Sequence, residues 1–219
     1  MSDAEEHLAG SRDGRQGALL DQRVKVVLFD FGGVVIRTPF ELGDHGWRGP
    51  FDPGNDELWG LSQDGSITER DYWHRRAAEL HPDSDDPTFS FMRTLYEQPE
   101  GEIVRPEIVA LMDELDRREL RIAALTNDLS KFHPQEWRDR MSVIRRFDPL
   151  IDLSHAGVLK PQPEAFERAL DALGVPASTV AFLDDQLPNV EAAAAAGMRA
   201  VWFDPTQVEQ SLDRLRAAL

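Results

Sequence analysis

Five short apolar runs recur along the chain, and this recurrence constrains the fold more than any other feature. They cover residues 24–29, 120–125, 149–153, 179–183 and 200–203. The first, Val24–Phe29, is almost continuously apolar and β-branched, as expected for a strand buried on both faces. Helical patterns lie between the runs. Alternation of this kind predicts an α/β fold with a Rossmann-like parallel sheet and helices on both faces.

Three segments have clear helical signals. Pro106 can occupy a first helical turn, and Ile108 and Leu111 begin an apolar face at a spacing of three to four residues. A second helix is expected from Pro163 to a stop at Gly174. The alanine-rich segment 189–196 is expected to form a third.

The stretch from about residue 37 to 105 breaks this rhythm, because it contains no convincing buried strand and is rich in Pro, Gly and Asp. We interpret it as a small helical insertion after the first strand. Residues 23–36 and 106–219 would then form the α/β core. The polar segment 1–22 has no apolar stretch, so it is not a secretory signal, and we expect a flexible tail.

Composition excludes several classes of function. Lys and Arg number 24 and Asp and Glu 40, which gives a net charge of −16 in 219 residues. This balance argues against binding to nucleic acid or to an anionic membrane surface. No apolar run approaches the roughly 18–20 residues of a spanning helix. The chain has no cysteine, which excludes thiolate chemistry and suits a cytoplasmic protein.

Polar residues follow the predicted strands, where an open α/β sheet binds its ligands. Asp30 follows the first run, Thr126 the second, and Asp184 and Asp185 the fourth, while Lys160 lies in the loop after the third. Taken singly, each has a plain explanation as a turn former, helix cap or solvated side chain. Their shared place after the strands predicts that they converge on one edge of the sheet.

With these motifs, the chain resembles the haloacid dehalogenase superfamily. The matching segments are 27–35, 125–127, 157–161, 182–185, 189–190 and 197–198, in the order of the family's four motifs. The insertion over 37–105 lies where this family carries a helical cap. Its part from Trp59 to Trp73 resembles the cap of a subgroup related to the phosphatase domain of soluble epoxide hydrolase.

The resemblance implies a phosphatase whose nucleophile is Asp30. A carboxylate can attack phosphorus and form an aspartyl-phosphate, which divides one difficult step into two. Mg²⁺, which prefers hard oxygen ligands, would bind between protein and substrate. Its implied ligands are Asp30, the backbone carbonyl of Gly32, Asp184 and Asp185.

The resemblance also implies how the substrate is held. Thr126 and the backbone amide of Asn127 would hydrogen-bond a phosphate oxygen, and Lys160 would offset the crowded negative charge. Asn189 would position the acidic loop or a substrate group, although a helix-capping role explains it equally well. The expected partner is a small phosphorylated molecule, and the protein is expected to be a monomer or homodimer.

Position 32 departs from the family pattern. Most family phosphatases have there a second Asp, which protonates the leaving oxygen and later activates water. Gly32 leaves three readings open: a phosphatase with an easier leaving group or an acid from elsewhere, a metal-independent dehalogenase that attacks carbon, or a weakly active relative that binds a ligand or partner. We favour the first. Candidates for another acid are Asp44, His45, His74 and His155.

The insertion is expected to determine the substrate. Its aromatic residues could line an apolar pocket, but a small core of their own is the simpler explanation. These residues are Trp47, Phe51, Trp59, Tyr72 and Trp73. Its arginines Arg48, Arg75 and Arg76 could meet a second anionic group on a substrate, although most surface arginines do nothing of the kind.

Overall fold

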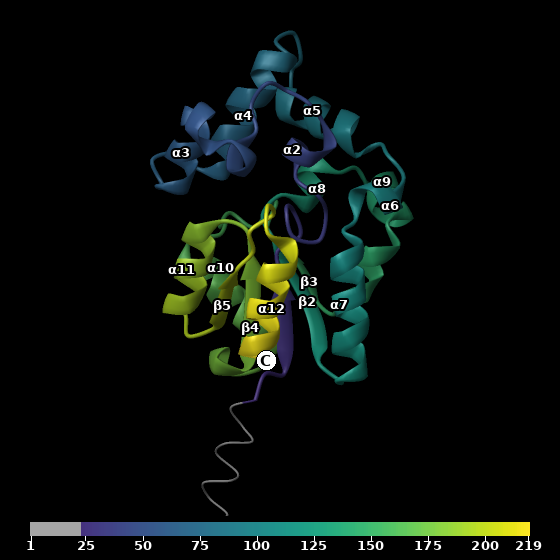
Figure 1. Ribbon diagram of the computed structural model, residues 1–219, viewed down its shortest axis with the longest axis vertical. Helices are drawn as coiled ribbons and strands as arrows, with labels where there is room; N and C mark the ends of the chain where they lie inside the picture. The colour runs from purple at the N-terminus through teal and green to yellow at the C-terminus, as the bar shows by residue number, and fades with distance from the viewer. Residues whose placement is uncertain (1–22) are drawn as a thin grey trace, which may run out of the picture.

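The computed structural model describes residues 23–219, so the predicted tail over 1–22 lies outside the described residues. Its centre is a parallel sheet in the order β3-β2-β1-β4-β5 (Figure 1). The strands are β1 (Val26–Phe29), β2 (Arg121–Thr126), β3 (Leu150–Asp152), β4 (Val180–Asp184) and β5 (Arg199–Trp202). Each lies within or next to one of the five apolar runs, and the predicted α/β fold is confirmed.

The register of the sheet brings three strand ends together. Phe29 at the end of β1 pairs with Ala124 of β2 and with Leu183 of β4. All four β1 residues are buried, as their apolar composition predicts for the central strand. Because the strands are parallel and in this register, the polar residues that follow them emerge at the same edge of the sheet.

Two pairs of helices cover the sheet (Figure 1). The apolar faces of α7 (Pro106–Arg117) and α12 (Val208–Ala218) pack in one cluster with the side chains of Val27 and Phe29. On the other face, α10 (Pro163–Leu173) and α11 (Leu187–Ala195) pack against Val26 and Leu28. The three predicted helices are confirmed, whereas the sequence analysis did not predict α12.

Residues 37–105, which we call the inserted segment, form helices beyond the carboxyl ends of the strands (Figure 1). They are α2 (Pro39–Leu42), η1 (Gly49–Phe51), η2 (Pro53–Asn55), α3 (Glu57–Gln63), α4 (Glu69–Leu80), α5 (Pro87–Tyr96) and α6 (Glu100–Ile103). Thr68 and Asp71 form a capping box that starts α4.

The inserted segment leaves and rejoins the rest of the chain through two adjacent points. Ile36 and Val104 form an antiparallel bridge. The Arg37 amide donates to the carbonyl of Ile103 at 2.8 Å, and the Arg105 amide donates to the carbonyl of Val35 at 3.1 Å. The segment that enters the inserted segment is therefore hydrogen-bonded to the segment that leaves it.

An aromatic cluster forms the interior of the inserted segment. The ring of Phe40 lies 5.1–6.0 Å, between centroids, from the rings of Trp47, Trp59, Tyr72 and Trp73. All five side chains are buried. Of the five aromatic residues named from sequence, Phe51 is only partly buried and the other four are buried together. Their cluster is continuous with the core on one face of the sheet, so it is not a separate core.

Asp56 is the polar centre of this cluster and is completely buried. Its carboxylate accepts hydrogen bonds from the Tyr72 hydroxyl at 2.7 Å and from the Trp59 amide at 3.1 Å, and it pairs with Arg76 at 2.5 Å. Arg76 is thus committed to the interior of the inserted segment, while Arg48 and Arg75 are exposed.

The remaining short elements connect the sheet strands. They are α8 (Leu129–Phe132), α9 (Gln135–Arg140), η3 (Ser142–Arg146) and η4 (Ala177–Thr179). Among residues 23–219, no helix has the length and apolar character that crossing a membrane requires.

Candidate active site

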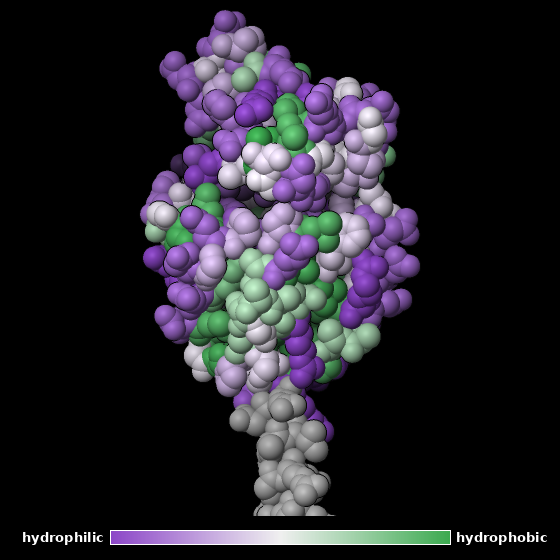
Figure 2. Space-filling view, turned by 90° about the vertical axis from the view of Figure 1, so that its left-hand side faces the viewer, coloured by the Kyte–Doolittle hydropathy of each residue, from purple (hydrophilic) through white to green (hydrophobic). Residues whose placement is uncertain are grey.

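A cavity lies where the carboxyl ends of the strands face the inserted segment. Its volume is about 70 Å³, and Asp30, Thr126, Lys160 and Asp185 line it from the side of the sheet. Figure 2, viewed from the side that carries α3 and α11, shows a recess between the two parts. The expectation that these residues converge on one edge is confirmed in space.

Lys160 lies between two carboxylates at the floor of the cavity. Its Nζ donates to Asp30 Oδ1 at 2.6 Å and to Asp184 Oδ2 at 2.7 Å. Burial alone lowers the pKa of Lys160, but the charges of Asp184 and Asp30 outweigh it and hold the pKa above the ordinary value. Lys160 is therefore a fixed positive charge.

The two adjacent acids after β4 differ in how they are held. Asp184 is fully buried, and besides Lys160 it accepts hydrogen bonds from the Gln186 amide at 2.8 Å and from Asn189 Nδ2 at 3.0 and 3.1 Å. The Asp185 carboxylate accepts one hydrogen bond from the described residues, from Gln186 Nε2 at 3.3 Å. Asp185 therefore has more free lone pairs to offer a ligand. Asn189 contacts the acidic loop, which carries Asp184 and Asp185, and does not line the cavity.

Asp30, Asp184 and Asp185 can each place a carboxylate oxygen within 4.8 Å of the others. Burial raises the pKa of Asp30 to about 8 against the opposing charge of Lys160. Burial, followed by the charges of Glu69 and Asp184, raises the pKa of Asp185 well above its usual range. Three crowded carboxylates beside one ammonium are short of positive charge, and hard oxygen donors fit a divalent cation.

Thr126 ends β2 and Asn127 follows it, and both line the wall of the cavity. The Thr126 hydroxyl and the Asn127 backbone amide have no hydrogen-bond partner among residues 23–219. The Asn127 side chain is occupied, because it donates to the Lys160 carbonyl at 3.0 Å and accepts from the Lys160 amide at 2.8 Å. This reciprocal pair joins the two loops and leaves two donors free toward the cavity.

The turn after Asp30 depends on two glycines in different ways. Gly33 has φ of +78°, and a Cβ there would lie 2.8 Å from Asp185 Cγ. At Gly32, φ lies outside the left-handed region and a Cβ would meet no atom within 4 Å. At position 33 a glycine is needed, because φ is left-handed and any Cβ would collide with the Asp185 side chain. At position 32 there is room for a side chain.

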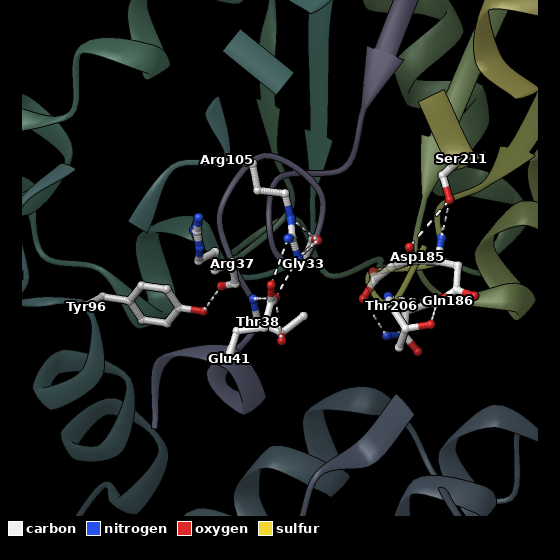
Figure 3. Close-up of polar contacts among 11 residues, drawn as sticks. Gly33, Arg37, Thr38, Glu41, Tyr96, Arg105, Asp185, Gln186, Thr206 and Ser211 are labelled. Carbon is white, nitrogen blue, oxygen red and sulfur yellow. Dashed lines mark hydrogen bonds and ion pairs between the residues drawn. The ribbon is translucent and has the colours of Figure 1, made fainter. Parts of the chain in front are cut away.

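A buried arginine anchors this turn to the inserted segment (Figure 3). The Arg105 guanidinium donates to the Gly33 carbonyl at 3.0 and 3.2 Å and pairs with Glu41 at 2.6 Å. Glu41 in turn accepts from the Thr38 amide at 2.8 Å. Arg105 and Glu41 were not predicted from the sequence, although Arg105 directly precedes the predicted first-turn proline.

Two contacts from the inserted segment flank the cavity. Gln63 Nε2 donates to Gln186 Oε1 at 2.7 Å, and Arg70 forms an ion pair with Asp128. Gln186 and Asp128 each follow a residue expected at the site. These contacts hold α3 and α4 over the sheet edge.

The family model for haloacid dehalogenase-like hydrolases matches residues 24–197, most of the chain. The chain belongs to this family. The match extends from β1 to the end of α11, and thus includes every segment that forms the cavity.

Relatives and solved structures agree with this assignment. The chain is 27% identical to a sesquiterpene phosphatase of Aspergillus oryzae over 183 residues. The aligned region covers 80% of this chain and 87% of that protein. The chain is 34% identical over 103 residues to a phosphoserine phosphatase of Thermus thermophilus, 45% of this chain and 40% of the relative. A HAD-hydrolase from Bacillus subtilis, bound to magnesium, shares the fold with a TM-score of 0.61 at 17% identity, over 84% of this chain and 88% of the other.

Two acidic residues that were not predicted from the sequence line the cavity, Asp128, which pairs with Arg70, and Glu69. Glu69, the first residue of α4, is half-buried and lines the cavity together with Asp30. Burial raises the pKa of Glu69 to about 7 against a hydrogen bond from Trp73, and the charge of Asp184 adds to the rise. Acidic residues are common at the start of a helix because they interact favourably with the helix dipole. The position of Glu69 in the sequence therefore did not indicate a functional role.

The acids proposed from sequence as substitutes lie elsewhere. Asp44, His74 and His155 are exposed, and His45 packs against Trp47. None of these four residues lines the cavity. Of the aromatic residues named from sequence, Trp59 and Trp73 line it as well as packing in the aromatic cluster.

Proposed function

We propose that the protein is a magnesium-dependent phosphatase that acts on small organic phosphate monoesters through an aspartyl-phosphate on Asp30. One observation carries the proposal: a buried carboxylate, held by Lys160, shares a cavity with free donors from Thr126 and Asn127. The names of the two phosphatase relatives support the same reaction class.

The proposed nucleophile is the oxygen of Asp30 that Lys160 does not hold. Lys160 orients Asp30 through Oδ1 at 2.6 Å, so Oδ2 is left for the phosphorus atom. Attack forms the Asp30 O–P bond and breaks the bond from phosphorus to the ester oxygen. Water then releases inorganic phosphate and regenerates the carboxylate.

Asp30, Asp185 and the Gly32 carbonyl would hold Mg²⁺, with Asp184 as a further ligand or as the residue that orients the loop. When bound, Mg²⁺ would neutralise charge on the transferring phosphoryl group. The Thr126 hydroxyl and the Asn127 amide would donate to phosphate oxygens as charge develops there. Asn189 would act on the acidic loop, because its amide donates to both oxygens of Asp184.

The inserted segment would act as a cap that selects the substrate. The cavity is lined both by the polar edge of the sheet and by Trp59 and Trp73 of the inserted segment. Trp59 and Trp73 would face the organic part of the substrate. Larger substrates would need the contacts of Gln63 and Arg70 with the core to open.

A phosphate-release screen over small organophosphates, with Mg²⁺ and with chelator, tests the proposal. We expect release that requires the metal and is lost in Asp30→Asn, whose amide is a poor nucleophile. Halide release from haloacids without metal would instead favour chemistry at carbon. Silence with both substrate classes would favour a ligand-binding relative. A cytoplasmic location and a monomeric or homodimeric state remain predictions.

A further inference from the structure

The start of α4 is fixed so that Glu69 points into the cavity. Thr68 and Asp71 form the capping box that begins the helix, and Arg70 pairs with Asp128 of the core. Between these anchors, Glu69 lines the same cavity as Asp30 and Gly32. Residues on both sides therefore set where the Glu69 carboxyl lies.

The Glu69 carboxyl has one oxygen held and one oxygen free. Trp73 Nε1 donates to Oε1 at 3.0 Å. Oε2 has no hydrogen-bond partner within residues 23–219. Glu69 also stands outside the tight group of Asp30, Asp184 and Asp185. A half-buried carboxyl with a free oxygen toward a cavity is available to a bound molecule.

The charge environment of Glu69 is set by the core loops that it faces. Asp184, Asp185 and Asp128 disfavour its ionised form, and Lys160 opposes them. Burial is the largest influence on its pKa. Burial and the charges of Asp184 and Asp128 therefore raise the pKa of Glu69.

We propose that Glu69 is the general acid and base of the reaction, acting from the inserted segment in place of the carboxyl that position 32 lacks. The inference rests on the proposed function. As the P–O bond to the leaving group breaks, the Glu69 carboxyl gives its proton to the departing oxygen, which leaves as an alcohol. In the second step the Glu69 carboxylate takes a proton from the water that attacks phosphorus, and the bond from phosphorus to Asp30 breaks.

The first test compares leaving groups in Glu69→Gln. Glutamine keeps an oxygen that can accept from Trp73 but has no proton to transfer. With an alkyl phosphate, kcat/KM should fall by about 10²-fold or more, because a basic leaving oxygen needs protonation. With 4-nitrophenyl phosphate, whose leaving group is a weak base, the fall in kcat/KM should be less than about tenfold. Glu79→Gln is the matched control, since Glu79 lies exposed on the same helix.

The second test follows the first turnover. With 4-nitrophenyl phosphate, Glu69→Gln should release nitrophenol in a burst of about one equivalent per active site and then slow down. The first step needs little protonation, whereas the second still needs a base to activate water. A merely structural role of Glu69 would lower the burst and the later rate together.

The third test restores the carboxyl at its usual place. A Cβ at Gly32 meets no atom within 4 Å, so Gly32→Asp should fold. The double variant Glu69→Gln/Gly32→Asp should regain at least about tenfold of the lost alkyl-phosphate activity, and Gly32→Asn should not rescue it.

Equal losses on alkyl and aryl substrates, or absence of both burst and rescue, would overturn the role of Glu69. A wild type without metal-dependent phosphate release on any substrate would overturn the proposed function instead. The two failures are therefore distinguishable.

Discussion

Lys160 Nζ lies 2.6 Å from Asp30 Oδ1, and the Lys160 side chain is 2% exposed. Removal of one partner of a buried ion pair leaves an uncompensated charge. Lys160→Met should therefore lower the free energy of unfolding by about 3 kcal/mol at neutral pH, measured by urea denaturation without metal. Lys131→Met, in a less buried position, should change it by less than about 0.5 kcal/mol. An unchanged stability in Lys160→Met would contradict the role of Lys160 as a buried ion-pair partner.

The acidic group of Asp30, Asp184 and Asp185 predicts stabilisation by metal. Mg²⁺ that binds only the folded state should raise the free energy of unfolding by about 2.7 kcal/mol at a hundred times its Kd, and the melting temperature should rise with it. Asp185→Asn should remove most of that rise, while Asp213→Asn, an exposed control, should keep it. Thermal denaturation with millimolar Mg²⁺ and with chelator measures the effect. An unchanged melting temperature of the wild type with Mg²⁺ would favour a metal-independent dehalogenase or a ligand-binding relative.

The adjacent glycines of the Asp30 turn should respond differently to the same substitution. Gly33→Ala places a Cβ against the Asp185 carboxylate and forces a left-handed φ on alanine. It should lower the free energy of unfolding by at least about 1–2 kcal/mol. Gly32→Ala should cost less than about 0.5 kcal/mol. Chemical denaturation of the pair decides this, and equal costs would contradict the backbone assignment.

His133 predicts a pH-dependent part of stability. Burial, followed by the charge of Arg138, lowers its pKa from 6.5 to about 3, so the folded state keeps the ring neutral, stacked on Trp137 at 3.9 Å. Between these pH values the unfolded state binds the additional proton, and the stability contribution, complete above pH 6.5, is lost as pH falls toward 3.

The matched variant for this prediction is His133→Phe, which keeps an aromatic ring. The difference in free energy of unfolding between wild type and variant should shift in favour of the variant by up to about 1.4 kcal/mol for each pH unit below 6. Because the cavity carboxylates are common to both proteins, their opposite pH dependence cancels in the difference. Parallel pH profiles would show that His133 is charged in the folded state.

Asp56 predicts how the inserted segment is stabilised. Asp56→Ala leaves Arg76 and the Tyr72 hydroxyl without their buried acceptor, and should cost about 3–5 kcal/mol. Asp52→Ala, which removes a partly exposed carboxylate that accepts a hydrogen bond from Asn55, should cost less than about 1 kcal/mol. Tryptophan fluorescence during denaturation reports on this cluster, since Trp47 and Trp59 lie within it. A similar cost for both variants would contradict the central role of Asp56.

The sheet and its polar edge could be predicted because each depends on local patterns. A strand such as Val26–Phe29, buried on both faces, is apolar throughout, and the residue after a parallel strand is fixed at the sheet edge. The placements of Asp30, Thr126 and Asp185 follow from these two facts alone.

Glu69 could not be predicted in this way, because its direction depends on how α4 packs over the sheet. Helix capping accounts for its neighbours Thr68 and Asp71. The spacing of residues along a helix does not distinguish an acidic side chain that faces a cavity from one that faces solvent. The same holds for Arg105, whose burial results from contacts with Gly33 and Glu41, remote in sequence. Long-range packing decided both positions.

The bridge between Ile36 and Val104 allows the inserted segment to change independently of the sheet. The inserted segment begins and ends at residues that are hydrogen-bonded to each other, so it forms a closed loop. The entropy cost of closing such a loop rises only logarithmically with its length, so its helices can be lengthened or exchanged at little cost. The strands that present Asp30 and Asp185 need not shift. The residues of the inserted segment that line the cavity can therefore diverge freely among descendants, while the polar edge of the sheet stays the same.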